Sequence, residues 1–252
     1  MLYMNEIEYI FSAGFRCYSP DTLKTYGLRP FSGPFDYLFI DIDSVFKLIN
    51  LKMSPFLNDI IVYNKNKQQN YNLSIINDLN EKNVCYMSHD YNNIDLRINV
   101  NFLDDKLSGN LYEWDKICIF HHHDICNKEI YDNISKRVDR FNKIMEKHYE
   151  KTCLFHITKI LTIDIQEYID NIIRLKLLYS IPCYITIIVC CDNLEDTCYF
   201  KCNILFIVKK VAPYSKQIVE GYGTDNNLDY TNEINIMKQI FNFQLVSLSD
   251  TF

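Results

Sequence analysis

The run Cys183–Cys190 constrains the fold most, because it is an apolar stretch of strand length rich in β-branched residues. A strand whose two faces both carry apolar side chains has to be covered on both sides, which is typical of a parallel sheet flanked by helices. Further apolar runs of strand length lie at Tyr9–Phe11, Ile117–Phe120, Thr152–Ile157 and Asn203–Val208. The sequence therefore predicts several buried strands.

Helical patterns alternate with these strands. Ser19, Pro20 and Asp21 favour a helix start, with Ser19 as the cap and Pro20 in the first helical position, and Gly27 favours its end. Apolar positions at helical spacing predict further helices at about 41–51, 128–149, 164–179 and 232–243. We expect one α/β domain over residues 1–252, with a mostly parallel sheet flanked by helices.

Residues 52–110 interrupt this pattern. Short apolar runs alternate there with turns rich in Asn and Lys, such as Asn64–Asn72, which favours a small antiparallel insertion or a lid. The pair His89-Asp90 lies in this segment, and we interpret it as an ordinary turn at a strand end.

Composition excludes several functions. A net charge of −6, with no basic stripe, speaks against a nucleic-acid partner. No apolar run is long enough to cross a membrane, and the first residues lack the basic region of a secretory signal. Ten cysteines in such a chain are expected to be reduced thiols in the cytoplasm. The chain has neither a Gly-x-Gly-x-x-Gly motif nor a P-loop, and we expect no cofactor.

Cys17 is the candidate nucleophile. It lies beside Arg16, three residues after Gly14 and just before a predicted helix. Positive potential at a helix N-terminus favours the thiolate, which is the reactive form of a cysteine. The alternative is a buried core thiol, because cysteine is among the most buried residue types.

His122, His123 and Asp124 follow a predicted strand, at the end where open α/β sheets collect their active-site groups. Either histidine is a candidate general base for Cys17. Adjacent strand residues point to opposite faces, so Asp124 is poorly placed to orient His123. Asp192, directly after the central apolar run, and Asp36 are the alternatives for the orienting acid.

Two alternatives to covalent chemistry concern metals and anions. The histidines could ligate zinc together with Asp124 and Cys126, but neighbouring histidines rarely face one ion, and we predict no metal site. The later cysteines lack the spacing of a zinc site and favour a strand core. Arg137 and Arg140 lie on one face of a predicted helix, where they could hold an anionic substrate group or be solvated or salt-bridged.

Four phrases resemble one family. They are Ser12-Ala-Gly-Phe-Arg-Cys17, Ser32-Gly-Pro-Phe-Asp-Tyr37, His122-His-Asp124 and Arg137-Val-Asp-Arg-Phe-Asn142. They resemble the Ser-Leu-Gly-x-x-Cys, Pro-Phe-Asp-Trp, His-His-Asp and Arg-x-x-Arg-Phe-Asn phrases of the proteins described as putative papain-like cysteine peptidases, found in large DNA viruses and bacteria. The resemblance implies a thiol hydrolase acting on a peptide or small-molecule substrate, in the host cytoplasm if the chain is viral.

In chain order, Cys17 precedes the histidines, as in papain-like enzymes. The papain pattern also places a glutamine upstream of the cysteine for the oxyanion hole, and this chain has none there. Backbone N–H groups or another donor would have to replace it. Two other classes stay open: a non-covalent α/β enzyme or binding module for a glycan or nucleotide, and a catalytically silent host-interaction protein.

Overall fold

The computed structural model describes twelve parts of the chain. They are residues 5–14, 18–38, 40, 42–54, 56–57, 60–64, 95–99, 118–119, 127–159, 165–191, 196–210 and 229–246. For residues 60–64, 95–99 and 118–119 the description covers the backbone alone.

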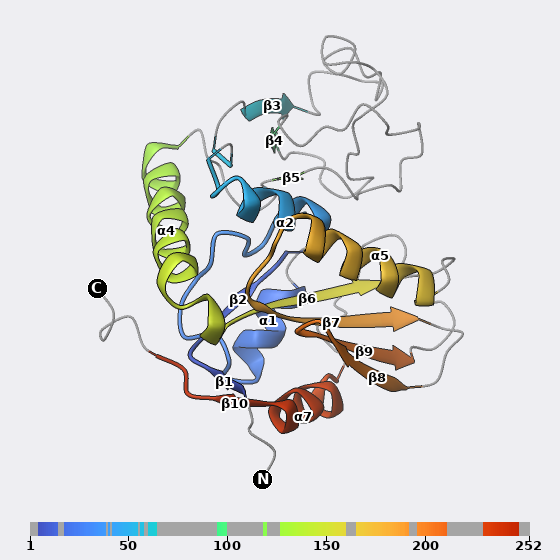
Figure 1. Cartoon of the computed structure of the whole chain (residues 1–252). Helices are drawn as coiled ribbons and strands as arrows, with labels where there is room; N and C mark the ends of the chain where they lie inside the picture. Colours follow the sequence, from blue (N-terminus) through green and yellow to red (C-terminus); the bar gives the residue numbers. More distant parts are fainter. Residues whose placement is uncertain are drawn as a thin grey trace.

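A five-stranded sheet forms the centre of the molecule, in the order β2-β6-β7-β9-β8 (Figure 1). Its strands are β2 (Tyr9–Ser12), β6 (Thr152–Lys159), β7 (Tyr184–Cys191), β9 (Ile204–Lys210) and β8 (Thr197–Lys201). The first four are parallel to one another, and β8 pairs antiparallel with β9 at the edge. The predicted mostly parallel sheet is confirmed.

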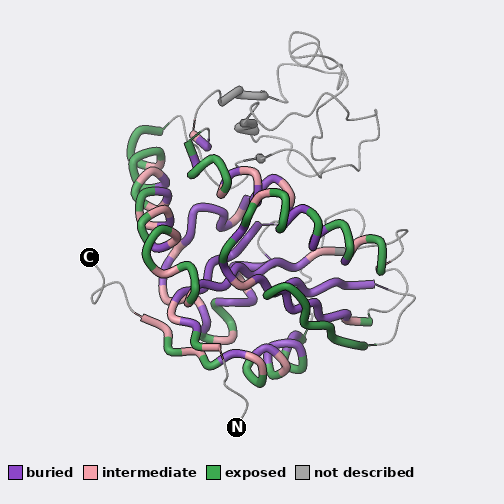
Figure 2. The backbone as a smooth tube through the Cα atoms, in the orientation of Figure 1, coloured by how far each residue is buried: buried purple, intermediate pink, exposed green. Residues whose placement is uncertain are grey.

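Helices cover both faces of the sheet, with α2 and α5 above it and α1 and α7 below it in the view of Figure 1. Their bounds are α1 (Tyr18–Thr25), α2 (Ile42–Asn50), α4 (Lys128–Lys147), α5 (Ile165–Leu178) and α7 (Thr231–Ile240). Successive strand residues pack into the cores on opposite faces of the sheet. Leu154 packs in the cluster with α2, α4 and α5, whereas Phe155 packs in the cluster with α1 and α7. The four parallel strands are accordingly mostly buried, whereas the edge strand β8 is exposed, as Figure 2 shows.

Helix α1 begins and ends close to the predicted residues. Gly27, at φ +68°, ends it in a Schellman motif, in which Leu28 N donates to Leu23 O and Gly27 N donates to Lys24 O. The expected capping role of Ser19 was wrong. The helix already begins at Tyr18, and the buried Ser19 hydroxyl instead accepts from Ile157 N of β6 (3.0 Å). This bond fixes the first turn of α1 to the sheet.

Helix α4 matches its predicted pattern. The Asn127 side chain accepts from Glu129 N (2.9 Å) and caps the helix. Its buried positions are Ile134, Val138, Phe141 and Ile144, all of them predicted to face inward. A short 3-10 helix, η3 (Tyr149–Lys151), then leads directly into β6.

A second, three-stranded antiparallel sheet has the order β3-β4-β5. Its strands are β3 (Ile60–Asn64), β4 (Asp95–Asn99) and β5 (Cys118–Ile119). The antiparallel pairing of β3 with β4 agrees with the expectation for residues 52–110. The strand near residue 119 lies in this second sheet and not beside the first strand, because β5 pairs antiparallel with β4 and the neighbour of β2 is β6. An apolar run shows that a strand exists but does not identify its partner.

The end of the last predicted helix was also wrong. Helix α7 ends at Ile240, and Phe241–Phe243 form strand β10, which pairs parallel with β1 (Asn5–Ile7). Phe241 is buried whereas Asn242 is exposed, an alternation that suits a strand. The Phe241 ring packs edge-on against Tyr184, at 5.4 Å between centroids.

Candidate functional site at the carboxyl edge of the sheet

The carboxyl ends of β2, β6, β7 and β9 lie along one edge of the central sheet, because these strands are parallel. Ligands of open α/β sheets bind at this edge. Gly14 turns the chain away from β2 with φ +84°, and a Cβ at this position would overlap Ile40. Only glycine combines this dihedral angle with so close an approach. The turn leads, through Phe15–Cys17, to the first residue of α1.

Most of the predicted catalytic residues lie outside the described residues: Arg16, Cys17, His122, His123, Asp124 and Asp192, together with His89 and Asp90. Their chain neighbours are described. Cys17 directly precedes Tyr18 at the start of α1, and Asp192 directly follows Cys191 at the end of β7. The convergence of Cys17 with a histidine stays a prediction.

Asp36 is described, and it lies buried in a loop that follows α1. Arg29 donates to its Oδ2 atom from Nε (3.1 Å) and from Nη2, and Gly33 N donates to the same oxygen (2.9 Å). Burial raises the pKa of the Asp36 carboxyl above its usual range, and the charge of Arg29 opposes this rise. Phe35 anchors the loop as expected, since its ring packs edge-on against Phe56 and Phe141.

Arg137 and Arg140 lie beside this loop on α4. Arg140 Nη2 donates to Ser32 O (2.6 Å), and its guanidinium lies over the Phe31 ring, 4.9 Å from the centroid. The charge of Arg137 is close enough to Asp36 for each group to influence the pKa of the other. The structure therefore brings three of the predicted site residues, Asp36, Arg137 and Arg140, into one neighbourhood. We call Arg29, Asp36, Tyr37, Arg137 and Arg140 the arginine cluster.

The arginine cluster is tied to the start of α1. Tyr37 OH donates to Asp21 Oδ1 (3.0 Å), and Arg29 Nη1 lies 3.5 Å from the same hydroxyl. Asp21 is in the first turn of α1, one turn after Tyr18. The cluster thus contacts the helix whose N-terminus directly follows Cys17.

His156 of β6 was not singled out from the sequence. Its Nδ1 lies 3.0 Å from Ala13 O, and the side chain is buried. Burial lowers the pKa of His156 to about 4, so the imidazole is neutral at neutral pH and donates a hydrogen bond to this carbonyl. A histidine inside an otherwise apolar strand was the available signal for this contact.

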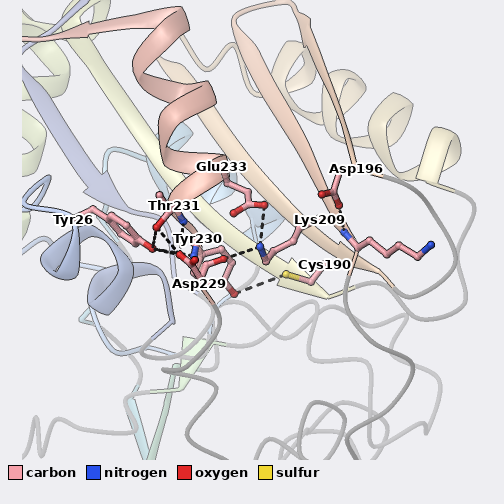
Figure 3. A network of polar contacts seen from close by, with 9 residues as sticks. Tyr26, Cys190, Asp196, Lys209, Asp229, Tyr230, Thr231 and Glu233 are labelled. Carbon is pink, nitrogen blue, oxygen red and sulfur yellow. Dashed lines mark hydrogen bonds and ion pairs between the residues drawn. The ribbon is translucent and has the colours of Figure 1, made fainter.

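A second polar network, at the ends of β7 and β9, was also missed. We call Tyr26, Lys209, Asp229, Tyr230 and Glu233 the lysine cluster. Lys209 Nζ donates to Glu233 Oε1 (3.0 Å) and to Asp229 O (2.7 Å), as Figure 3 shows, and it lies over the Tyr230 ring at 5.4 Å.

Asp229 Oδ1 in turn accepts from Thr231 N (2.9 Å) and from Tyr26 OH (3.0 Å) (Figure 3). The lysine cluster thereby joins the end of α1 and β9 to the start of α7. The acidic residues at the start of the predicted last helix were the local sequence signal for the lysine cluster. Its hydrogen-bonded partners lie far apart in the sequence, so the pairs themselves could not be predicted.

Cysteines of the described regions fall into two groups. Cys153, Cys183, Cys190 and Cys191 are buried, whereas Cys198 and Cys202 are exposed, and all six are free thiols. Burial raises the pKa of Cys153 and that of Cys183 to about 12. The predicted strand-core role is confirmed for Cys183, Cys190 and Cys191. Within the described ranges, no cluster of His, Cys, Asp and Glu has the arrangement of a metal site.

These features define an α/β protein with an open, mostly parallel sheet and polar groups along its carboxyl edge. A family model described as "Putative papain-like cysteine peptidase" matches residues 8–191, more than half of the chain. The chain belongs to this family. Neither the curated proteins nor the solved structures contain a match to the chain. No helix among the described residues is long and apolar enough to cross a membrane.

Proposed function

We propose that the protein is a cysteine hydrolase that cleaves an amide or ester bond, with Cys17 as nucleophile and His123 or His122 as general base. One observation carries the proposal: in a chain of this family, Cys17 directly precedes the first residue of α1, on the connection that leaves the carboxyl end of β2. Positive potential at the helix N-terminus, next to Arg16, supports a thiolate.

The reaction follows from these roles. The histidine takes the proton of the Cys17 thiol, and the resulting thiolate attacks the carbonyl carbon. The protonated histidine then donates this proton to the leaving amine or alcohol as its bond to the carbonyl carbon breaks. Water, activated by the same histidine, then hydrolyses the thioester. The first N–H groups of α1 are our candidates for the oxyanion hole, because no glutamine precedes Cys17 and these groups have no intrahelical partners.

Asp192 is our first candidate for the acid that orients the histidine. It directly follows β7, two strands away from β2 in the sheet order. Asp36 is the second candidate, but its Oδ2 atom already accepts from Arg29 and Gly33. Asp124 is the third, and its adjacency to His123 makes it the least suitable.

Trapping the acyl intermediate tests the proposal. The wild-type protein is mixed with activated esters and peptide thioesters, quenched in acid, and mapped by mass spectrometry after proteolysis. We expect an acyl adduct on Cys17 that is lost in Cys17→Ala and that accumulates when deacylation is slowed in His123→Ala or His122→Ala. Turnover that persists unchanged in Cys17→Ala would contradict the proposal.

A second candidate function is non-covalent binding of an anionic ligand, such as a nucleotide or an acidic glycan. The observation that favours it is the excess of arginines around Asp36, which does not involve the cysteine. In this case, Cys17→Ser leaves ligand binding and any activity nearly intact.

We also propose a single domain over residues 1–252 that acts on a peptide or small-molecule substrate in the cytoplasm, that of a host cell if the chain is viral. The free thiols of the described cysteines support a reducing compartment. Cell fractionation with a tagged full-length chain checks the compartment, and disulfides formed in the native protein would speak against it.

A further inference from the structure

Arg137 and Arg140 are half-buried cations on α4, and among the described residues neither forms an ion pair. The acid whose charge acts on both of them is Asp36. Asp36 is already engaged by Arg29, at 3.1 Å from Nε. Among the described residues, three guanidinium groups therefore act on this one carboxylate, and the arginine cluster as defined carries two more positive than negative charges.

The hydrogen bonds of the three arginines differ. All three guanidinium nitrogens of Arg29 form hydrogen bonds. Nε and Nη2 donate to Asp36, Nη2 also donates to Ser32 Oγ (2.9 Å), and Nη1 donates to Tyr37 OH (3.5 Å). Arg140 donates from Nη2 to Ser32 O, but its buried Nε–H has no acceptor in the described parts of the chain. Arg137 makes no hydrogen bond or ion pair with the residues that the structure describes. Donors thus remain for a ligand on both α4 arginines.

The proximity and partial burial of these three arginines disfavour their charged forms. Desolvation lowers the pKa of Arg137, and the nearby charge of Arg29 lowers it further. Desolvation also lowers the pKa of Arg140, with a further contribution from Arg137. Like charges that are partly removed from water and lack acceptors destabilise the folded state, and a bound anion would reverse this effect.

We propose that Arg137 and Arg140 bind an oxyanion group, a carboxylate or a phosphate, carried by the substrate. The planar guanidinium fork matches both groups in charge and in the spacing of its donors. The inference deepens the proposed function by naming a substrate class, and it rests on that function in assigning the anion to the substrate of Cys17.

The connection to Cys17 runs through described residues. Tyr37 joins the arginine cluster to Asp21 in the first turn of α1, and α1 begins directly after Cys17. An acidic group held on α4 would therefore belong to a substrate whose reacting bond lies at the start of α1.

Anion binding is measured first, by calorimetric titration with inorganic phosphate and with acetate at constant ionic strength. We expect saturable binding of at least one probe to the wild type and equally to Cys17→Ala. Arg137→Gln and Arg140→Gln should each weaken it about tenfold or more, since each removes a charge-assisted hydrogen bond. Arg137→Lys, which keeps the charge but not the fork, should fall in between. Arg174→Gln is the matched control, because Arg174 is exposed on α5, where it donates to Asn171 Oδ1 (2.8 Å).

The source of the oxyanion is tested with peptides that carry a free C-terminal carboxylate, an amidated C-terminus, or a phosphoserine. A preference for the free carboxylate identifies a peptide terminus, and a preference for phosphoserine identifies a phosphorylated substrate. In hydrolysis, Arg137→Gln should raise KM for the preferred peptide and leave KM for the amidated peptide unchanged.

Binding of both probes that is as weak in the wild type as in Arg137→Gln, or equally weakened in Arg174→Gln, would overturn the inference. This result is distinguishable from failure of the proposed function. If the proposed function fails, anions still bind to the wild type and to Cys17→Ala, but no acyl adduct forms on Cys17. The arginine site then belongs to a bound ligand and not to a hydrolysed substrate.

Discussion

The arginine cluster and the lysine cluster both tie α1 or the loop after it to another element, but their charges are balanced differently. In the lysine cluster, Lys209 Nζ donates to Asp229 O and to Glu233 Oε1 and lies over the Tyr230 ring. In the arginine cluster, three guanidinium groups share Asp36. Lys209, the cation of the lysine cluster, is engaged by these neighbours, whereas Arg137 and Arg140 retain donors that no described residue accepts.

This difference separates a structural role from a functional one. A cation whose donors all have protein acceptors stabilises the packing that it joins, and little of its hydrogen-bonding capacity is left for a ligand. Partly desolvated cations without acceptors destabilise the folded state, and they keep donors for a ligand, so a bound anion would stabilise them. We therefore assign the lysine cluster to stability and the two α4 arginines to binding.

Removal of the shared acid should have the largest effect. Asp36→Ala leaves Arg29 without its counterion, at a position where the side chains of the pair are 12% and 1% exposed. We expect a loss of about 3–5 kcal/mol in the free energy of unfolding, measured by urea denaturation. Arg29→Met combined with Asp36→Ala should recover part of this loss, because the largely buried guanidinium of Arg29 is then no longer left without its counterion. An additive double variant would show that the pair is not coupled.

The buried histidine of β6, His156, makes stability depend on pH. Burial lowers the pKa of His156 to about 4 in the folded protein, against an ordinary value of about 6.5 in the unfolded chain. Between these values the unfolded state binds more protons, so stability rises with pH and is lost as the pH falls. From about pH 7 to about pH 4 this group should cost about 3 kcal/mol.

The difference in unfolding free energy between the wild type and His156→Gln isolates this effect, because other groups titrate equally in both proteins. The difference should shrink as the pH falls through this window. A difference that is constant across the window would show that His156 is not held neutral.

Lys209→Met tests the structural role of the lysine cluster. It leaves Glu233, a side chain only 3% exposed, without its cation. We expect a loss of about 2 kcal/mol in unfolding free energy and no change in anion binding. Glu233→Gln should cost less, since the amide keeps an acceptor for Lys209. Weakened phosphate or acetate binding in Lys209→Met would undo the assignment of roles.

The sequence predicted the layers of this fold better than its long-range contacts. The apolar runs at Tyr9–Phe11 and Cys183–Cys190 identified central strands, and Gly27 identified a helix end, because burial pattern and turn chemistry are local properties. The partner of β5, the exposed edge strand β8 and the short strand β10 were not predicted. Pairing depends on which segments meet in three dimensions, and two- or three-residue strands carry little pattern.

The site divides in the same way. Arg137 and Arg140 were identified as neighbours from their helical spacing, and Asp36 was identified as a candidate from the phrase Ser32-Gly-Pro-Phe-Asp-Tyr37. The bonds of Asp36 to Arg29, of His156 to Ala13 and of Lys209 to Glu233 were not foreseen, because each joins residues whose proximity only the folded chain creates.

The smallest stability effect is expected for Arg137→Gln. This change removes a cation that has no hydrogen bond to the described parts of the chain and that is repelled by Arg29. Its unfolding free energy should equal that of the wild type or exceed it slightly, by about 0.5 kcal/mol at most. A loss of several kcal/mol, measured in the same urea series, would place Arg137 among the structural residues and erase the contrast between the clusters.

The reactivity of Cys17 tests the central claim most directly, because it requires no knowledge of the substrate. The native protein is alkylated with substoichiometric iodoacetamide at neutral pH, and each labelled cysteine is quantified by peptide mapping. Exposed Cys198 and Cys202 serve as internal references for ordinary thiols, and buried Cys153 and Cys183 for inert ones.

We predict that Cys17 reacts about tenfold faster than either exposed reference, since a thiol pKa one unit below the ordinary value raises the thiolate fraction by about that factor. The advantage should disappear in the His123→Ala or the His122→Ala variant, which identifies the base. Labelling of Cys17 no faster than that of Cys198 and Cys202 would contradict the account of this protein as a cysteine hydrolase.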